Sequence, residues 1–280
     1  MITRGLMPPL IDTHCHLDAY TTDDEVGEVL ARARSVGVRL IVNAGTTVES
    51  SQRCVELTKT FPELYAGVGI HPMDLTGPVD EDIYSQLLRH ATSTDKVIVI
   101  SETGLDFLDN MPDRAMQYQA FREQIRLARE LQMPIVFHSR EAHDEVLRLL
   151  REERAYEVGG AMHYFQGDMD TARAAIDLGF YISLAKPLLR LPHLQTVAAN
   201  LPLDRIVLET DSAPQPFKAK RENWTEPRHL HDIAGKLAEL RGIDTGEVRH
   251  VTSDNFLKML GDRGARVRSA VVGECYPSSF

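Results

Sequence analysis

Residues 10–18 read LIDTHCHLD and place two histidines one residue apart after a short apolar run. Side chains two positions apart on a strand point to the same face, so a strand here brings Asp12, His14 and His16 together. Neutral imidazole binds zinc, manganese, iron or nickel, and two rings on one rigid strand lose little entropy on binding. The stretch therefore predicts a metal clamp. The alternative is two histidines at a sheet edge, and the rest of the chain decides between them.

The composition is typical of a globular protein, with 43% hydrophobic and 26% charged residues among 280. The sequence contains no run of eighteen apolar residues and no charged leader before an apolar stretch. It therefore predicts a cytoplasmic protein without a membrane span. Cys15, Cys54 and Cys275 are too scattered for a disulfide framework, and strand alternation makes Cys15 a packing residue. The net charge of −10 disfavours broad binding to nucleic acid but allows a local cationic site.

Eight apolar, β-branched runs recur along the chain, with helical patterns between them. The runs are 10–13, 38–44, 64–70, 97–101, 134–137, 160–164, 180–184 and 205–210. Their near-continuous hydrophobicity is typical of parallel strands that helices cover on both faces. Strand and helix alternating eight times predict an α/β protein with a (β/α)8 barrel, and a long doubly wound sheet is the alternative.

The helical patterns carry start signals, because Thr22, Asp80, Asp168 and Asp244 each precede one as an expected N-cap. No Gly- or Pro-rich linker divides the chain. We therefore expect one domain over residues 1–261 and, because periodicity is lost after Gly261, a C-terminal tail over 262–280.

Six candidate metal ligands fall at the carboxyl ends of the expected strands. They are His14, His16, Glu102, His138, His163 and Asp211. In a closed barrel these ends form one rim, where barrel enzymes place their active sites, so distant residues become neighbours. Four histidines and two carboxylates exceed the needs of one tetrahedral ion, which predicts two divalent ions with Glu102 between them. Such a pair, about 3.5 to 4 Å apart, can hold a hydroxide and stabilise the oxygens of a phosphoryl group. The two carboxylates leave the site cationic, which favours an anionic substrate.

Six motifs occur in a fixed order along the chain. They are DTHCHLD at 12–18, GIHP at 69–72, ETGLDF at 102–107, FHSRE at 137–141, HYFQG at 163–167 and LETDSAP at 208–214. As a set they resemble the TatD-type metal-dependent deoxyribonucleases, over residues 10 to 260. The resemblance implies a TIM-barrel hydrolase of the amidohydrolase type with a divalent metal centre that cleaves phosphodiester bonds in DNA. The six candidate ligands match that family's metal ligands by position. The chain departs from the family pattern at Ser101, Tyr164, Gln166 and Lys186, which concerns substrate specificity more than metal binding.

Two carboxylates are the candidate catalytic residues, Glu102 as the central ligand and Asp211 as a ligand that orients or deprotonates the attacking water. The alternative for Asp211 is a helix cap. His71 is expected to contact a substrate phosphate or the leaving oxygen, or else to pack against Pro72. Arg140 is expected to hold a phosphate oxygen, or else to form a local ion pair.

Three further polar residues have expected supporting positions. Asp12 is expected to hydrogen-bond a ligand histidine, and Asp106 to fix the loop after its strand. His143 falls on a helix beyond its strand and is expected to face solvent.

A basic stretch that contains the single tryptophan, FKAKRENWTEPR at 217–228, completes the candidate substrate contacts. Basic groups beside an aromatic ring can hold single-stranded nucleic acid through phosphate contacts and base stacking. The candidates are Lys186, Lys218, Lys220, Arg221, Trp224 and Arg228. The alternative is an ordinary solvated loop in which Trp224 is a packing anchor.

We therefore expect a deoxyribonuclease, an exonuclease that acts on single-stranded or damaged DNA ends with two Zn, Mn or Mg ions and needs no obligate protein partner. One alternative keeps the metal centre and changes the bond, as in an esterase, lactonase or cyclic amidase. The other is a metal-binding scaffold without turnover.

Overall fold

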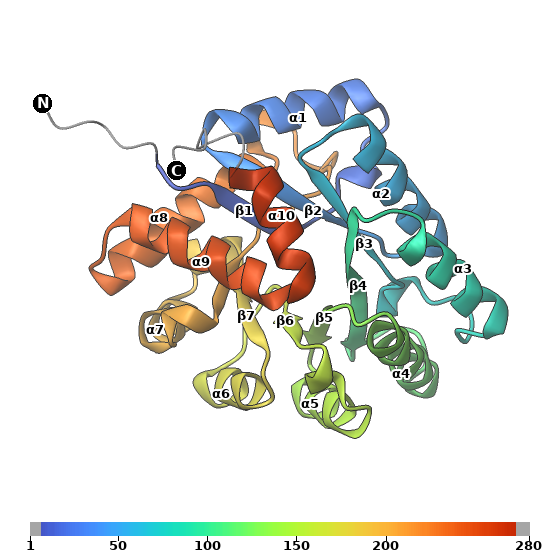
Figure 1. Cartoon of the computed structure of the whole chain (residues 1–280). Helices are drawn as coiled ribbons and strands as arrows, with labels where there is room; N and C mark the ends of the chain where they lie inside the picture. The colour runs from blue at the N-terminus through green and yellow to red at the C-terminus, as the bar shows by residue number, and fades with distance from the viewer. Residues whose placement is uncertain (1–6, 273–280) are drawn as a thin grey trace, which may run out of the picture.

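The computed structural model describes residues 7–272 as a parallel eight-stranded sheet that curls into a nearly closed barrel inside a ring of helices (Figure 1). The strand order follows the chain, and every adjacent pair from the first to the eighth strand is parallel. The strands are β1 (Leu10–Cys15), β2 (Val38–Ala44), β3 (Leu64–Val68), β4 (Val97–Asp106), β5 (Ile135–Arg140), β6 (Gly160–Met162), β7 (Tyr181–Leu184) and β8 (Ile206–Leu208). The predicted (β/α)8 barrel is confirmed.

The helices begin where their caps predict. Thr22, Asp80, Asp168 and Asp244 each accept a hydrogen bond from a backbone N–H of the first helical turn that follows. The helices are α1 (Asp23–Ser35), α2 (Val48–Thr60), α3 (Glu81–Thr92), α4 (Arg114–Glu130), α5 (His143–Glu152), α6 (Met169–Asp177), α7 (Pro192–Asn200), α8 (Leu230–Arg241), α9 (Thr245–Met259) and α10 (Asp262–Val272).

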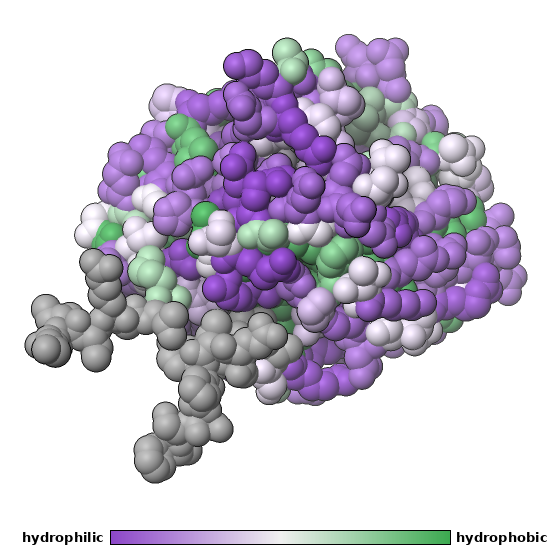
Figure 2. Space-filling model, turned by 90° about the horizontal axis from the view of Figure 1, so that it is seen from above, coloured by the Kyte–Doolittle hydropathy of each residue, from purple (hydrophilic) through white to green (hydrophobic). Residues whose placement is uncertain are grey.

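The apolar side chains form two clusters. The larger lies mostly between the strands and the surrounding helices, and the smaller joins strand residues such as Ile11, Val99 and Val207 to α9 and α10. Seen from above, the molecule presents a largely hydrophilic surface on which apolar side chains form small separate areas (Figure 2). Among residues 7–272, no helix combines the length and the apolar character that crossing a membrane requires.

The prediction of an irregular tail is wrong for residues 262–272, which form α10. Val267 is buried in the smaller cluster, and Gly264 lies so close to α9 that an added Cβ would be 1.9 Å from the carbonyl oxygen of Leu257. A helix that packs through one valine and one glycine has little apolar periodicity, which explains the error. The last part of the expected tail, 273–280, lies outside the described residues.

The first and last strands meet in what we call the β1–β8 seam. Asp12 accepts hydrogen bonds from the Thr210 backbone N–H (2.9 Å) and hydroxyl (2.6 Å), and the Thr13 hydroxyl donates to the carbonyl of Leu208 (3.1 Å). The expected hydrogen bond between Asp12 and a ligand histidine is present, but it comes from the backbone N–H of His14 and not from the ring. Asp12 is fully buried, and its carboxylate joins the two ends of the sheet.

We expect Asp12→Ala to lower the free energy of unfolding by about 2 to 3 kcal/mol, because the N–H and hydroxyl of Thr210 lose their buried acceptor. Thermal unfolding followed by circular dichroism should show a decrease of about 5 °C in the midpoint for a chain of this size. Asp24→Ala, at an exposed site on α1, is the control and should change the midpoint little. Equal midpoints for both variants would contradict the role of Asp12.

Candidate metal centre

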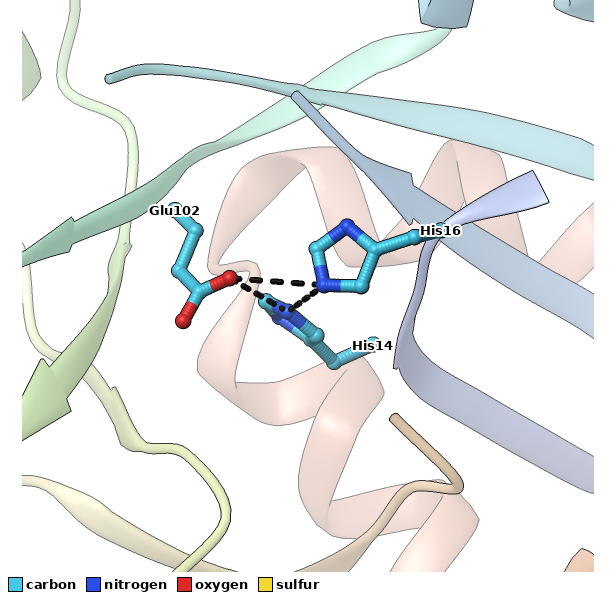
Figure 3. A group of neighbouring side chains, drawn as sticks. All are labelled: His14, His16 and Glu102. Atoms are coloured by element: carbon cyan, nitrogen blue, oxygen red, sulfur yellow. Dashed lines mark hydrogen bonds and ion pairs between the residues drawn. The ribbon is translucent and has the colours of Figure 1, made fainter. Parts of the chain in front are cut away.

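Glu102, His14, His16 and Asp211 form one side of a buried cluster inside the rim. Glu102 Oε2 lies 3.3 Å from His14 Nε2 and 3.4 Å from His16 Nε2, and the two ring nitrogens are 3.3 Å apart (Figure 3). Asp211 Oδ1 lies 3.3 Å from His16 Nε2. Two imidazole nitrogens at this separation repel each other unless a proton or a cation lies between them. This side of the cluster is therefore arranged around a shared positive charge.

The other oxygen of the same carboxylate faces a second set of rings. Glu102 Oε1 lies 2.6 Å from His163 Nε2, 3.4 Å from His138 Nδ1 and 3.3 Å from His71 Nε2. Both ring nitrogens of the buried His163 lack a hydrogen-bond partner within residues 7–272, although Glu102 is so close. A buried polar atom without a partner is costly, so His163 fits a site that a cation completes.

The strands deliver these side chains to one place. His14, Glu102 and His138 lie within β1, β4 and β5, whereas His16, His163 and Asp211 follow β1, β6 and β8. Glu102 lies inside β4 because this strand runs to Asp106, beyond the apolar run that predicts it. The structure thus brings together all six side chains that the sequence predicts as ligands.

Three groups of these side chains have ligand atoms within 4.8 Å of one another. They are His14, His16 and Glu102; His14, His163 and Asp211; and His71, Glu102 and His138. Imidazole nitrogens and carboxylate oxygens suit Zn²⁺ or Mn²⁺. Glu102 belongs to two of the groups, and its two oxygens face different histidines. The residues present therefore fit a metal centre.

The second nitrogen of each ring indicates where its proton lies. His16 Nδ1 is 3.0 Å from the carbonyl oxygen of Ala44, which can only accept, so this nitrogen carries a proton and Nε2 is the nitrogen that faces the cluster. His138 Nε2 is 3.0 Å from Asp106 Oδ2, so this nitrogen donates to the carboxylate and Nδ1 is the nitrogen that faces Glu102. A ring nitrogen that donates to a carbonyl or carboxylate leaves the other as a metal ligand.

His71 has the opposite polarity. Its Nδ1 accepts a hydrogen bond from the backbone N–H of Met73 at 3.1 Å, so the proton of the neutral ring lies on Nε2. That N–H faces Glu102 and the pocket. Although His71 belongs to one of the three groups, its hydrogen bonds make it a donor into the site and not a ligand.

The charges of the cluster depend on one another. Burial opposes ionisation of Glu102, but the nearby charge of His163 and the hydrogen bonds with His138 and His14 hold the pKa of this carboxyl well below its usual range. Burial opposes ionisation of Asp211 too, and the hydrogen bond from His16 lowers its pKa to about 2. Burial disfavours a charged His16, yet the hydrogen bonds with Asp211 and Glu102 raise its pKa well above its usual value. Without a metal ion, protons supply the positive charge that the carboxylates require.

Asp106 holds both His138 and Arg140. Its Oδ2 accepts from the Arg140 Nε–H at 2.8 Å, and its Oδ1 accepts from the backbone N–H of Leu108 at 3.1 Å. The expected role in fixing the loop is confirmed, and the contact with His138 is an addition that the sequence analysis missed. The Arg140 side chain, 41% exposed, therefore forms the local ion pair named as its alternative, while it also lines the pocket.

One more residue, Glu209, escaped the sequence analysis, and His143 lies in a different environment from the one expected. Glu209 is fully buried, accepts hydrogen bonds from the Ser183 hydroxyl (2.6 Å) and the Tyr164 backbone N–H, and has Oε1 3.4 Å from His163 Nδ1. A glutamate at the end of the apolar β8 run was the available signal. His143 was expected to face solvent, but it is half-buried in the pocket lining with Nδ1 2.7 Å from the hydroxyl of Ser139.

A pocket of about 820 Å³ opens over the cluster and includes His71 and Arg140 in its lining. The substrate contacts predicted for Lys186 and for the loop over 217–228 lie outside this lining. Lys186 donates to the Thr225 hydroxyl, Lys218 to Gln215, and Arg221 to Glu25; Arg228 and Lys220 pair with Glu226 and Glu222, and Trp224 packs against the larger core.

A (β/α)8 barrel with histidines and carboxylates gathered inside its C-terminal rim defines the class of metal-dependent hydrolase barrels. The family model described as "TatD related DNase" matches residues 11–261. The chain belongs to this family and is a metal-dependent hydrolase.

Similar proteins come from several bacteria. The chain is 34% identical over 255 residues to the Bacillus subtilis protein named "Uncharacterized metal-dependent hydrolase YabD", which covers 89% of the chain and 98% of the relative. It is 31% identical over 261 residues to the "3'-5' ssDNA/RNA exonuclease TatD" of Cronobacter sakazakii, over 89% of the chain and 97% of that protein. The crystal structure of the TatD homolog YJJV from Escherichia coli has a TM-score of 0.80 and 27% identity, over 91% and 98% of the two chains.

We expect Glu209→Gln to weaken divalent-metal affinity about 10- to 100-fold, because the amide removes the negative charge beside His163 Nδ1. Competition titration with a chromophoric chelator measures this change directly. Glu239→Gln is the control, since that carboxylate pairs with Lys236 on the exposed part of α8. Unchanged affinity in Glu209→Gln would contradict a positioning role for Glu209.

We also expect metal affinity to fall as the pH falls. Since the pKa of His16 is raised above its ordinary value, the ring is protonated at neutral pH, and a metal ion must displace that proton. One displaced proton makes the apparent affinity for Zn²⁺ rise about tenfold per pH unit between pH 6 and 8. Calorimetric titrations in buffers of different ionisation enthalpy count the released protons, and a pH-independent affinity would contradict the assignment.

Proposed function

We propose that this chain hydrolyses phosphodiester bonds in DNA, as an exonuclease that acts on single-stranded or damaged ends. The observation that carries the proposal is the cluster around Glu102, which has two acidic ligands for two divalent ions. Two carboxylates cannot neutralise two such ions, so the loaded centre attracts an anion. The proposed ligands are His14, His16, Glu102, His138, His163 and Asp211. Bound divalent ions acidify a water molecule and stabilise charge on phosphoryl oxygens.

The two acidic ligands differ in access to the pocket. The Asp211 side chain is 25% exposed, whereas that of Glu102 is 5% exposed and surrounded by rings. Only a carboxylate with access to water can orient the attacking molecule or take its proton. We therefore assign this role to Asp211 and assign Glu102 to holding the centre together.

His71 is placed to serve the leaving group. Its Nε2–H points into the pocket, and its side chain is only 9% exposed, so the ring has little freedom to turn away. A fixed donor near a departing oxygen stabilises the charge that develops there. Arg140, the last residue of β5, adds a partly exposed cation to the lining of the same pocket.

The relative from Cronobacter sakazakii supports a nucleic acid substrate, because its name gives single-stranded DNA and RNA as substrates. We further propose that the loop over 217–228 and Lys186 contact the strand beyond the pocket. Lys220 supports this extension, since its side chain is 71% exposed and its ammonium lies 3.6 Å from Glu222. Contacts of this kind depend on salt, whereas the metal cluster depends on it much less.

The direct test is an assay of the metal-loaded protein with an end-labelled single strand, the same strand in a duplex, and a panel of esters and lactones. We expect stepwise shortening of the single strand, and a decrease in rate of about a thousandfold in Asp211→Asn. Asp232→Asn, outside the pocket lining, is the control. Ester turnover without DNA cleavage would favour the amidohydrolase alternative. If Glu102→Ala left every measured activity unchanged, the centre would not be catalytic, and the alternative of a metal-binding scaffold would be favoured.

For His71, we expect Asn and Gln to act differently. Gln places an N–H near the position of Nε2, whereas Asn replaces only the Nδ1 side of the ring. His71→Gln should therefore retain more of kcat than His71→Asn, which we expect to lose about 100-fold. Bound metal, measured by atomic emission, should stay unchanged in both variants. A loss of metal in both would make His71 a ligand and refute the donor assignment.

A further inference from the structure

A second cavity, of about 400 Å³, lies at the end of the barrel away from the metal centre. It is formed where β3 and β4 begin, where α4 gives way to β5, and where α10 crosses the barrel (Figure 1). Its apolar lining includes Val97, Ile98, Met133 and Val267, and none of its residues belongs to the metal cluster. Cavities of this size hold small organic molecules, and an inorganic ion would leave most of the volume empty.

Two cations in this lining, Lys96 and Arg263, form hydrogen bonds with backbone carbonyls and no ion pair among the described residues. Lys96 Nζ donates to the backbone carbonyls of Pro62 and Leu64 and lies 4.3 Å from the centre of the Tyr65 ring. Arg263 donates to the backbone carbonyls of Leu131 and Gln132. Carbonyl oxygens accept hydrogen bonds and carry no net charge. Within the part of the chain that the structure describes, neither cation forms an ion pair with a carboxylate.

A third cation, Arg266, stands beside them on α10. Its guanidinium is 3.5 Å from Asp95, and both side chains are well exposed, so this pair is weak. The lining thus holds three cations and one carboxylate. Burial lowers the pKa of Lys96. Burial and the charge of Arg266 lower the pKa of Arg263 against the opposing charges of Asp95 and Asp262.

Helix α10 supplies part of the lining of this cavity. The match to the family model ends at residue 261, and α10 begins at Asp262. Arg263, Arg266 and Val267 therefore lie outside the residues that the family model matches. Lys96 and Tyr65 lie on the barrel itself, and α10 adds the two arginines and one apolar wall.

We propose that this cavity binds a small organic anion, a phosphate or phosphonate group on a compact apolar body. The anionic group lies among Lys96, Arg263 and Arg266, where lysine and arginine donors suit its oxygens. The apolar body lies against Val97, Met133 and Val267. This site is independent of the hydrolytic reaction, because the two cavities share no residue.

The test uses phenylphosphonate, whose carbon–phosphorus bond a phosphodiesterase does not cleave. The probe is titrated by calorimetry into the metal-loaded full chain, with inorganic phosphate as the second probe. The informative variant is Arg266→Ala, because this exposed side chain supports no backbone carbonyl. Its matched control is Arg268→Ala, which removes the same charge from the same helix at a residue paired with Asp254 outside the cavity.

We expect the wild type and Arg268→Ala to bind phenylphosphonate equally, and Arg266→Ala to bind it about tenfold more weakly, as the loss of one charge-assisted contact predicts. Inorganic phosphate should bind more weakly than phenylphosphonate, because it has no apolar body. Equal affinity in wild type and Arg266→Ala would place the probe at the metal centre and overturn the proposal. Absence of binding would overturn it too. Equal affinity for phenylphosphonate and inorganic phosphate would refute the proposed contact of an apolar body with Val97, Met133 and Val267.

Discussion

The hydrogen bonds of the β1–β8 seam are the constraint on which the cluster of candidate metal ligands depends. Residues 14 and 211 are far apart in the chain, and they become neighbours because Asp12 accepts from Thr210 and the Asp211 backbone N–H donates to the carbonyl of His14. Asp211 has a φ of +50°, a left-handed conformation that aspartate tolerates better than most residues. The turn directs its carboxylate toward His16. The closure of the barrel and the construction of the site are therefore one arrangement of hydrogen bonds.

The second constraint is the charge of Glu102. A carboxylate this deeply buried is costly alone, and the protein offsets the cost with imidazoles on both of its oxygens. Two of the rings have hydrogen-bond partners on their far side, because His16 Nδ1 contacts the carbonyl of Ala44 and His138 Nε2 contacts Asp106. These two partners fix which nitrogen of each ring faces the cluster. Beside His163 lies the charge of Glu209, whose Oε1 is 3.4 Å from His163 Nδ1. The orientation of these candidate ligands thus depends on residues that contact the outer side of each ring. His71 differs, because its outer nitrogen accepts a hydrogen bond from the Met73 N–H instead of donating one.

The sequence predicted what depends on local patterns and on the geometry of a closed barrel. Eight apolar runs indicated eight strands, and the common position of six polar residues at strand ends indicated one cluster. The partners of the second ring nitrogens were not predictable, because they involve contacts such as Ala44 with His16 that no periodicity encodes. The same reason applies to Arg221, whose partner Glu25 lies on α1. Helix α10 was missed because a single valine and a close glycine contact replace the usual apolar stripe.

Net charge is a poor guide to local electrostatics in this chain. The chain has 41 acidic and 31 basic residues, and on the outer surface many arginines pair with glutamates, as Arg122 does with Glu152 and Glu153, and Arg148 with Glu145. Positive charge without a carboxylate partner can attract an anion most strongly inside the two cavities. At the carboxyl rim, divalent ions would supply it against two acidic ligands. At the opposite end, backbone carbonyls hold Lys96 and Arg263 in place without neutralising them. The local distribution of charge, and not the net charge of the protein, determines where an anion is stable. A barrel with a net negative charge can therefore bind anions at two separate positions.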